Sequence, residues 1–223
     1  MASAPVLDQQ QGSGVRRERT RIVELYTAPP ANTTVIGVDE LGPVVPRTFP
    51  PAPGWSPGGH RVKAPLDYAR GPEKTWLYGA LRLTDGQAVT MTAASRNSVS
   101  YQNFLALVEK ANPRGNIVII TDNLSSHNSV STRDWLAGHQ RIGHAFIPVG
   151  ACWLNLQEGW WRIFRRYALA GVSLATADDI AYVTDNATTQ LNQKAGPWIW
   201  GRPPPPRDAS AAGSSTRNKK RST

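Results

Sequence analysis

Two short apolar runs in the sequence lead directly to aspartates, and this arrangement could place carboxylates at a reaction site. Residues 117–120 are apolar and are followed by Thr121 and Asp122, while residues 35–38 are followed by Asp39. Such runs predict strands that are buried on both faces. The carboxyl end of a buried strand is where open α/β sheets place ligands and chemistry. The alternative for Asp122 is that it starts a turn or caps a helix.

A third carboxylate, Glu158, lies in residues 150–169, which predict a loop that enters a long helix. At 100° per residue, Glu158 is within about 40° of Arg162 and Arg165. It lies outside a stripe of apolar residues at helical spacing, which predicts core packing. The stripe consists of Leu156, Trp160, Ile163, Phe164 and Tyr167. Glu158 either forms a surface ion pair with Arg162 or acts together with the two aspartates.

Three carboxylates at one place would favour a metal ion. They repel one another and would take up protons unless a cation compensates their charge. Mg²⁺ is usually held by a few carboxylates, water and substrate phosphate. Two such ions can activate an attacking oxygen and stabilise a leaving oxygen in phosphoryl transfer.

The order of the expected elements explains how these carboxylates could meet. Three hairpin-linked strands precede the first helix, and strands and helices alternate after it. This order predicts an α/β fold, with a ribonuclease H-like mixed five-stranded sheet flanked by helices. The first and fourth strands would be neighbours, which would place Asp39 beside Asp122. The strands are expected at residues 33–40, 75–84, 88–93, 117–120 and 144–149, and the helices at 101–111, 132–138, 150–169 and 175–191.

Local signals set the ends of the expected helices. Ser98 or Ser100 is expected to cap the first of them, and Ser131 or Thr132 the second. Thr176 is expected to cap the last, with two aspartates in its first turn, where they complement the helix dipole.

Length and composition limit the class of protein. The 223 residues can form one domain of ordinary size with extensions. The single cysteine, Cys152, excludes an internal disulfide and a multi-cysteine zinc site. The sequence has no apolar run of membrane-spanning length and no secretory signal, so we expect a cytoplasmic protein that does not enter a membrane.

The net charge of +9 is unevenly distributed. Residues 202–223 carry +5 and the rest of the chain +4, which alone is weak evidence for nucleic-acid binding. We expect residues 1–32 to form a flexible arm with a short basic helix, residues 33–201 the folded domain, and residues 202–223 a Pro-rich basic disordered tail. The basic helix either packs on the edge of the domain or contacts DNA.

Three motifs, taken together and in order, resemble those of DDE transposases from bacterial insertion sequences related to the mariner elements. They are V-D-E at residues 38–40, T-D-N-L-S-S-H at 121–127 and W-L-N-L-Q-E-G-W-W at 153–161. In addition, 35 residues separate Asp122 from Glu158, a spacing in the usual range of that family. The resemblance covers about residues 17–203.

The resemblance implies that Asp39, Asp122 and Glu158 form a catalytic triad that binds two Mg²⁺ ions, with Mn²⁺ as a substitute. In such enzymes an activated water cleaves double-stranded DNA at the ends of the element, and the freed 3′-hydroxyl attacks target DNA. Relatives assemble as homodimers on DNA. Asn123 and His127 follow the second aspartate and could orient it or a phosphate. The arginines after Glu158, namely Arg162, Arg165 and Arg166, could contact DNA phosphates.

The sequence also departs from the family pattern. Relatives carry helix-turn-helix units ahead of the catalytic domain, whereas only about 30 residues precede Val35 here. We therefore expect a catalytic domain without its end-recognition unit, which would be cytoplasmic and associated with the nucleoid. Two alternatives remain: a ribonuclease H-like nuclease not engaged in transposition, and a non-catalytic remnant that binds DNA or a partner.

Overall fold

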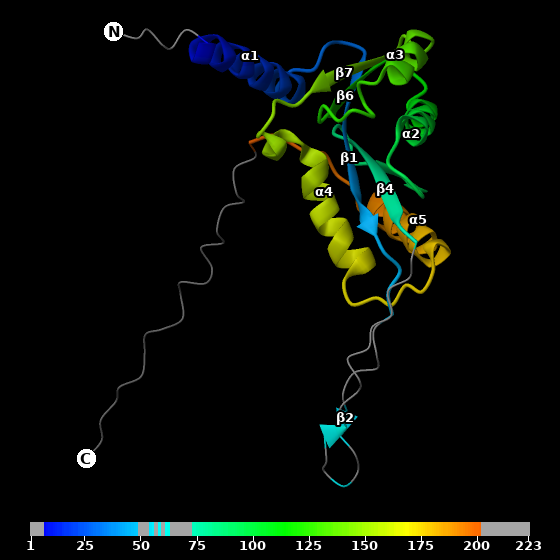
Figure 1. The fold of residues 1–223 in the computed structure, drawn as a ribbon. Coiled ribbons are helices and arrows are strands. Elements are labelled where there is room, and N and C mark those ends of the chain that lie inside the picture. The colour runs from blue at the N-terminus through cyan, green and yellow to red at the C-terminus, as the bar shows by residue number, and fades with distance from the viewer. Residues whose placement is uncertain (1–6, 49–53, 56–57, 59–60, 63–72, 202–223) are drawn as a thin grey trace, which may run out of the picture.

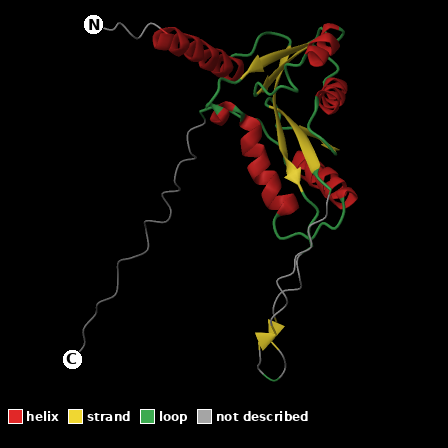
Figure 2. Ribbon diagram, viewed as in Figure 1, coloured by secondary structure: helices red, strands yellow, loops and turns green. Residues whose placement is uncertain are grey.

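The computed structural model describes residues 7–48, 54–55, 58, 61–62 and 73–201, and these form a central mixed sheet covered by helices on both faces (Figures 1 and 2). The expected tail, residues 202–223, lies outside the described residues, as do residues 1–6. The five strands are β1 (Thr33–Val44), β4 (Thr75–Arg82), β5 (Ala88–Ala93), β6 (Asn116–Thr121) and β7 (Ile142–Phe146). Two further short strands, β2 (Gly54–Trp55) and β3 (Arg61–Val62), pair with each other.

The sheet has the strand order β5-β4-β1-β6-β7. Strand β4 is antiparallel to both β1 and β5, as expected for strands that follow one another through short connections. Strands β6 and β7 continue the sheet in parallel with β1. The mixed five-stranded sheet of the ribonuclease H type is therefore confirmed, including the contact between its first and fourth strands.

The helices divide between the two faces of the sheet. On one face, α2 (Ser98–Ala111) and α3 (Val130–Ala137) cover a core that contains Ile36, Val38 and Ile119. On the other face, α4 (Leu156–Phe164) and α5 (Ala177–Gln193) cover a second core, joined by α1 (Leu7–Thr27). The 3₁₀-helix η1 (Cys152–Leu154) precedes α4, and the π-helix η2 (Arg165–Leu169) follows it.

Strand β1 belongs to both cores because its side chains alternate between the faces. Val35 and Leu41 pack in the core under α4 and α5, whereas Ile36 and Val38 pack in the core under α2. The two consecutive acidic residues at the end of this run, residues 39–40, therefore point to opposite faces of the sheet, as the alternation predicts.

The helix caps differ in part from expectation. Asn97 caps α2, and its side chain accepts a hydrogen bond from the Ser100 amide at 2.8 Å, so the predicted serine cap was wrong. Ser129 caps α3 two residues earlier than predicted. Thr176 caps α5 as predicted, and Asp179 completes a capping box by accepting a hydrogen bond from the Thr176 amide. Asn and Ser are nearly equivalent caps, which explains the shift of one or two positions.

Helix α1 begins at Leu7, earlier than the sequence predicts. Its C-terminal part packs on the edge of the domain: Ile22 is buried, and the Tyr26 hydroxyl donates a hydrogen bond to the Leu154 carbonyl at 2.5 Å. The Tyr26 ring also stacks on Trp200. The edge-packing interpretation of the basic helix is thus correct, and its arginines at residues 16, 17, 19 and 21 are exposed.

The buried side of α4 is rotated from the predicted stripe. Trp161 is fully buried, whereas Ile163 and Tyr167 are 40% and 65% exposed, so their predicted core positions were wrong. An indole buries more apolar area than an isoleucine, which favours rotation of the helix toward Trp161. The π-helical turn of η2 further breaks the regular spacing of 100° per residue at Tyr167.

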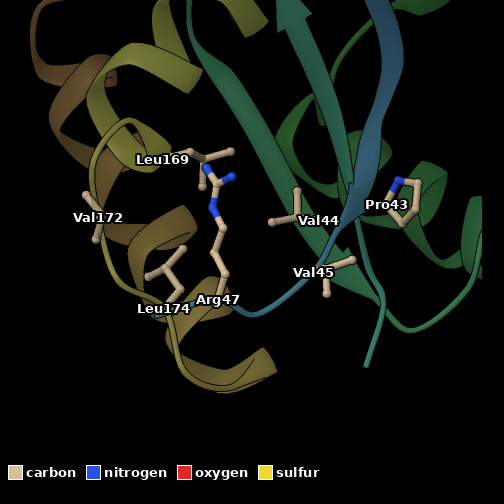
Figure 3. A pocket seen from close by; sticks show the side chains of 7 residues that line it. All are labelled: Pro43, Val44, Val45, Arg47, Leu169, Val172 and Leu174. Carbon is tan, nitrogen blue, oxygen red and sulfur yellow. The ribbon is translucent and has the colours of Figure 1, made fainter. Parts of the chain in front are cut away.

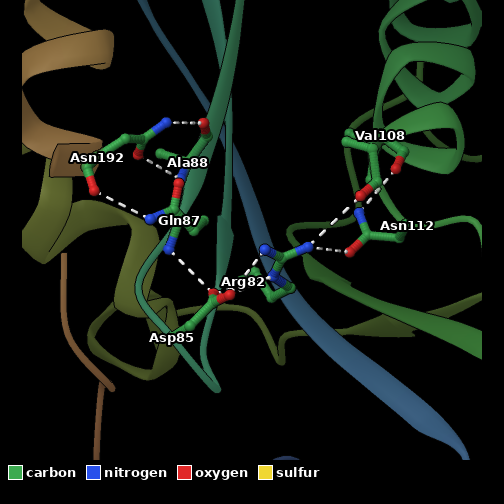
Figure 4. Close-up of polar contacts among 8 residues, drawn as sticks. Arg82, Asp85, Gln87, Ala88, Val108, Asn112 and Asn192 are labelled. Atoms are coloured by element: carbon green, nitrogen blue, oxygen red, sulfur yellow. Dashed lines mark hydrogen bonds and ion pairs between the residues drawn. The ribbon is translucent and has the colours of Figure 1, made fainter.

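A polar network joins the β4–β5 hairpin to two helices (Figure 4). Arg82 forms paired hydrogen bonds with Asp85 at 2.7–3.0 Å and donates to Asn112 Oδ1, just after α2, at 3.0 Å. Asn192 of α5 exchanges hydrogen bonds with the backbone of Ala88, both at 2.8 Å. These contacts fix α2 and α5 to opposite faces of the same hairpin.

A cavity of about 290 Å³ lies where β1 ends (Figure 3). The loop after η2 forms its other wall, and an isolated antiparallel bridge joins Arg47 to Leu174 beside it. Its lining is mostly aliphatic: Pro43, Val44, Val45, Arg47, Leu169, Val172 and Leu174.

Helix α4 packs so closely on the sheet that Gly79 of β4 has no space for a side chain. A methyl group there would overlap the Trp161 ring and lie 2.5 Å from Gln157 Nε2. We therefore expect Gly79→Ala to destabilise the fold by about 2 kcal/mol or more, because overpacking forces the backbone or the ring to move. The melting temperature should fall by about 4–8 °C. Gly143→Ala in β7 is the matched control, since nothing lies within 4 Å of its methyl group, and an equal loss in both variants would contradict the packing argument.

Candidate metal centre

A cavity of about 320 Å³ opens beside the middle of β1 and the carboxyl end of β6, and three carboxylates line it. Asp39 comes from β1, Asp122 follows β6, and Glu158 lies in the first turn of α4. The other lining residues are Asn123, Leu124, Ile147, Pro148, Val149, Gly150, Cys152 and Asn155. The structure therefore brings all three predicted acids to one cavity.

The strand register explains why the two aspartates meet. Gly37 of β1 pairs with Ile120 of β6 in a parallel ladder. Continuing that register by two residues sets Asp39 opposite Asp122. Both chains reach the same edge of the sheet in the same direction, so both carboxylates lie at the cavity.

Asn155 fixes the third acid. Its Nδ2 donates to the Val38 carbonyl at 2.9 Å, and its Oδ1 accepts from the Gln157 amide at 3.1 Å. One side chain therefore caps α4 and ties the start of that helix to β1, next to Asp39. The sequence analysis did not identify Asn155, although its position three residues before Glu158 is that of a helix cap.

The electrostatics of Asp39 reflect burial first and crowding by like charges second. Burial, followed by the negative charges of Glu158 and Glu40, raises its pKa from 3.8 to about 8. Asp122 adds a smaller contribution of the same sign. A cation in the cavity would offset this repulsion and keep Asp39 ionised at neutral pH.

His127 lies behind Asp122, on the α2 side of the sheet, and contacts two carboxylates. Its Nε2 lies 2.7 Å from Glu40 Oε1, and its Nδ1 lies 3.1 Å from Asp122 Oδ1. The side chains of His127 and Glu40 are 0% and 1% exposed. Burial alone would lower the pKa of His127, but its contacts with Asp122 and Glu40 together raise it to about 9. The imidazolium therefore compensates the buried charge of Glu40, a residue that the sequence analysis did not assign to the site.

A stack of rings supports His127. The Tyr101 ring lies against it with centroids 4.1 Å apart, and the Tyr101 hydroxyl is 3.0 Å from His144 Nε2. Burial, with a smaller effect of the charge on His127, lowers the pKa of His144 to about 4. Positive charge is thus concentrated on the histidine that faces the carboxylates.

Two observations test whether the site fits a divalent ion. Asp122 Oδ1 lies 3.1 Å from His127 Nδ1, and within the described residues no hydrogen bond or ion pair involves the other oxygen of this carboxylate, whose side chain is 50% exposed and lines the cavity. Asp39, Asp122 and Glu158 together offer hard oxygen ligands, which Mg²⁺ prefers. The residues present therefore fit a divalent ion.

A second group of potential ligands overlaps this one. Within the described residues, Glu40, Asp122 and His127 are a set whose ligand atoms all lie within 4.8 Å of one another. In this set Glu40 and His127 already satisfy each other at 2.7 Å, so an ion there would have to break a buried ion pair. The cavity lined by Asp39, Asp122 and Glu158 has no such obstacle.

The remaining predicted residues lie around the centre. Asn123 is exposed and lines the cavity, whereas Arg162, Arg165 and Arg166 are exposed along the outer side of α4 and η2. Glu158 and Arg162 do not form the surface ion pair that the sequence allowed, because the ion pairs of the described residues include neither side chain. None of the described helices is long and apolar enough to cross a lipid bilayer.

Comparisons with known proteins identify a family and a fold. The family model described as "DDE superfamily endonuclease" matches residues 34–181. A solved structure of the Mos1 transposase catalytic domain with raltegravir and Mg has the same fold, with a TM-score of 0.50 and 12% sequence identity over 86% of this chain and 94% of that one. The crystal structure of the catalytic domain of Mos1 mariner transposase is similar, with a TM-score of 0.49 and 10% identity over 87% and 94% of the two chains. No curated protein sequence matches the chain.

The raised pKa of Asp39 predicts how stability depends on pH without divalent ions. Because the folded state binds this proton more tightly than the unfolded state, the stabilisation is complete below about pH 4 and is lost as the pH rises toward 8. Between pH 4.5 and 6.5, His144 acts in the opposite direction, because its lowered pKa makes stability rise with pH over that range. The contribution of Asp39 should therefore appear as a difference between variants: the melting temperature of the metal-free wild type should fall relative to that of Asp39→Asn across this window, which lies below the range in which His127 adds a loss.

Thermal unfolding in EDTA measures the effect, with Asp185→Asn on the exposed face of α5 as the control. Added Mg²⁺ should raise the melting temperature more at pH 8 than at pH 5, since protons compete with the ion for Asp39. Equal slopes in the wild type and Asp39→Asn would show that burial and neighbouring negative charge do not raise the pKa of Asp39 in the folded protein.

Proposed function

The chain belongs to the DDE superfamily endonucleases, and from this premise we propose that it is a transposase catalytic domain that cleaves DNA and transfers strands with divalent metal ions. The proposal extends to the mariner-related insertion sequences, whose motifs residues 38–40, 121–127 and 153–161 resemble. Its substrates are double-stranded element ends and target DNA, and we expect two copies of the chain to act on them together.

One observation carries the proposal: carboxylates from three distant parts of the chain line a single cavity. A structural ion-pair network would supply basic partners, but Asp39 and Glu158 have none within the described residues. Uncompensated negative charge at the carboxyl edge of a sheet fits a centre that binds cations and phosphate.

Asp39, Asp122 and Glu158 would hold two Mg²⁺ or Mn²⁺ ions. When bound, such ions lower the pKa of water and stabilise the charge of the leaving oxygen in phosphoryl transfer. The chain itself contributes the fixed positions of these three carboxylates. The aliphatic side chains of Ile147 and Leu124 form part of the cavity wall.

His127 positions Asp122 in this proposal. The imidazole is held between Glu40 and Asp122 and is fixed by the Tyr101 ring. It therefore restricts the orientation of the Asp122 carboxylate, because Oδ1 is held beside the imidazole at 3.1 Å and the rest of the side chain lines the cavity. Asn123 is exposed beside Asp122, where its amide can donate a hydrogen bond to a phosphate oxygen.

Arg162, Arg165 and Arg166 give the DNA backbone a positive surface next to the centre. They follow Glu158 at four, seven and eight residues, and all three are exposed along the outer side of α4 and η2. A guanidinium forms paired hydrogen bonds with phosphate oxygens. These residues would hold a strand whose scissile phosphate lies at Glu158.

Nicking of supercoiled plasmid tests the function. With Mg²⁺ or Mn²⁺ the wild type should convert supercoiled to open-circular DNA, and EDTA should stop the reaction. Asp39→Asn, Asp122→Asn and Glu158→Gln should each lower the rate by about 10³-fold or more, because each removes a metal ligand while keeping a similar shape. Asp185→Asn should retain full activity. Equal activity in all variants would exclude the metal-dependent enzyme and favour a non-catalytic DNA-binding protein.

The role of His127 has a separate test. His127→Asn should lower the nicking rate by about 10–100-fold and raise the Mg²⁺ concentration for half-maximal rate, since groups that orient ligands have effects of that size. It should also destabilise the fold by about 3–5 kcal/mol, because Glu40 becomes a buried charge without a partner. The double variant Glu40→Gln/His127→Asn removes that charge.

The double variant separates stability from activity. We expect it to recover most of the melting temperature and little of the activity, because Asp122 still lacks its imidazole contact. Recovery of full activity together with stability would show that His127 acts only in folding.

A further inference from the structure

A hollow of about 610 Å³ lies on the outer side of α4 and η2, away from the sheet. Its lining consists of Arg162, Ile163, Arg166 and Tyr167. All four are exposed, and the two apolar members keep 40% and 65% of their surface accessible. The core side chains of this helix are Trp161 and Phe164. The exposed isoleucine and tyrosine are therefore available to a partner.

The backbone presents these residues in an unusual way. The Ala170 amide donates to the Arg165 carbonyl at 3.0 Å, a hydrogen bond five residues apart that belongs to the π-helix η2. Ala168 of the same segment is buried, so the wider turn keeps the core contact while it turns Tyr167 outward. Such π-helical insertions occur frequently at functional sites.

The charges at the hollow are not neutralised by the chain. Within the described residues, Arg162 and Arg166 take part in none of the ion pairs, and no side-chain hydrogen bond involves them. Glu158, one turn before Arg162, is directed to the metal cavity instead. The hollow therefore combines two unpaired guanidinium groups with one aromatic and one aliphatic side chain.

We propose that this hollow binds an unpaired stretch of the DNA strand that leaves the metal centre, with phosphates at Arg162 and Arg166 and a base stacked on Tyr167. The inference rests on the proposed function and names the substrate structure for that site. At a rise of 1.5 Å per residue, the two arginines lie about 6 Å and 12 Å beyond Glu158 along the helix axis. A strand bound at Glu158 would therefore contact Arg162 first and Arg166 second.

Chemistry favours an unpaired strand over a duplex. A duplex stacks its bases internally and offers only phosphates, which would leave Ile163 and Tyr167 without a role. An unpaired base has a free π-face, and stacking on an aromatic side chain is a common way to bind single strands without sequence preference. Ile163 can support the same base or its sugar by apolar contact.

Binding of fluorescein-labelled DNA to the full chain in EDTA tests the proposal by fluorescence anisotropy. One probe is a blunt duplex, and the other is the same duplex with an unpaired extension of ten nucleotides. The wild type should bind the extended probe more tightly. Tyr167→Ala should weaken that binding about fivefold or more, the equivalent of about 1 kcal/mol, and change duplex binding by less than twofold. Tyr167→Phe should bind like the wild type.

Tyr182→Ala on α5 is the matched control, because Tyr182 is equally exposed at 71% but lies beside Asp178 and Asp185 on its helix. Tyr182→Ala should change the binding of neither probe. Arg162→Gln and Arg166→Gln should weaken both probes and reduce the salt dependence of binding. A melting temperature within about 2 °C of the wild type for Tyr167→Ala will exclude a folding effect.

The outcomes separate this proposal from the proposed function. If Tyr167→Ala affects both probes equally, or neither, or if the wild type does not prefer the extended probe, the unpaired-strand site is wrong. Metal-dependent nicking that requires Asp122 would still stand in that case. If Tyr167 is needed to bind the extension but Asp122→Asn nicks DNA like the wild type, the proposed binding site is supported and the proposed catalytic role of Asp122 is wrong.

Discussion

The parallel pairing of β1 with β6 determines where chemistry can occur in this chain. The paired part of β1 ends at Gly37 opposite Ile120 of β6, and an acidic residue follows two positions later in each chain segment, Asp39 within β1 and Asp122 just after β6. Their repulsion must then be offset locally. The N-terminus of α4 supplies part of that compensation for Glu158, since the helix dipole favours negative charge in the first turn. His127 and a bound cation would supply the rest of the compensation. The charge balance at this edge of the sheet therefore follows from the pairing of β1 with β6.

The alternation of β1 divides its two acids between different tasks. Asp39 faces α4 and the cavity, where it meets Glu158 and Asp122. Glu40 faces α2 and is enclosed with His127. Because a regular strand cannot turn both side chains to one face, the neighbouring carboxylates cannot bind the same ion without a bulge. Asp39 is therefore available to a metal ion, whereas Glu40 holds His127, which contacts Asp122. The site is assembled from both faces of the sheet.

The sequence predicts the sheet better than the details around it. Runs of apolar β-branched residues mark the strands, and their order along the chain limits the topology to few choices. Asn97 and Ser129 were missed as caps because several neighbouring residues cap equally well. Glu40 escaped notice because its partner, His127, is 87 residues away in the sequence and is recognisable only when the strands are paired. Asn155 was missed for the same reason, since its contact with Val38 spans 117 residues.

The rotation of α4 determines which side chains lie on its inner surface and which lie on its outer surface. Trp161 enters the core in place of Ile163, and Gly37 and Gly79 of the sheet allow the helix to approach closely. That approach leaves little freedom to slide or turn, because a ring and an amide lie directly against backbone. The position of Glu158 in the cavity and that of Tyr167 on the outer side are therefore set by the same packing. A DNA strand held at both places, as we propose, would follow the helix axis away from the centre.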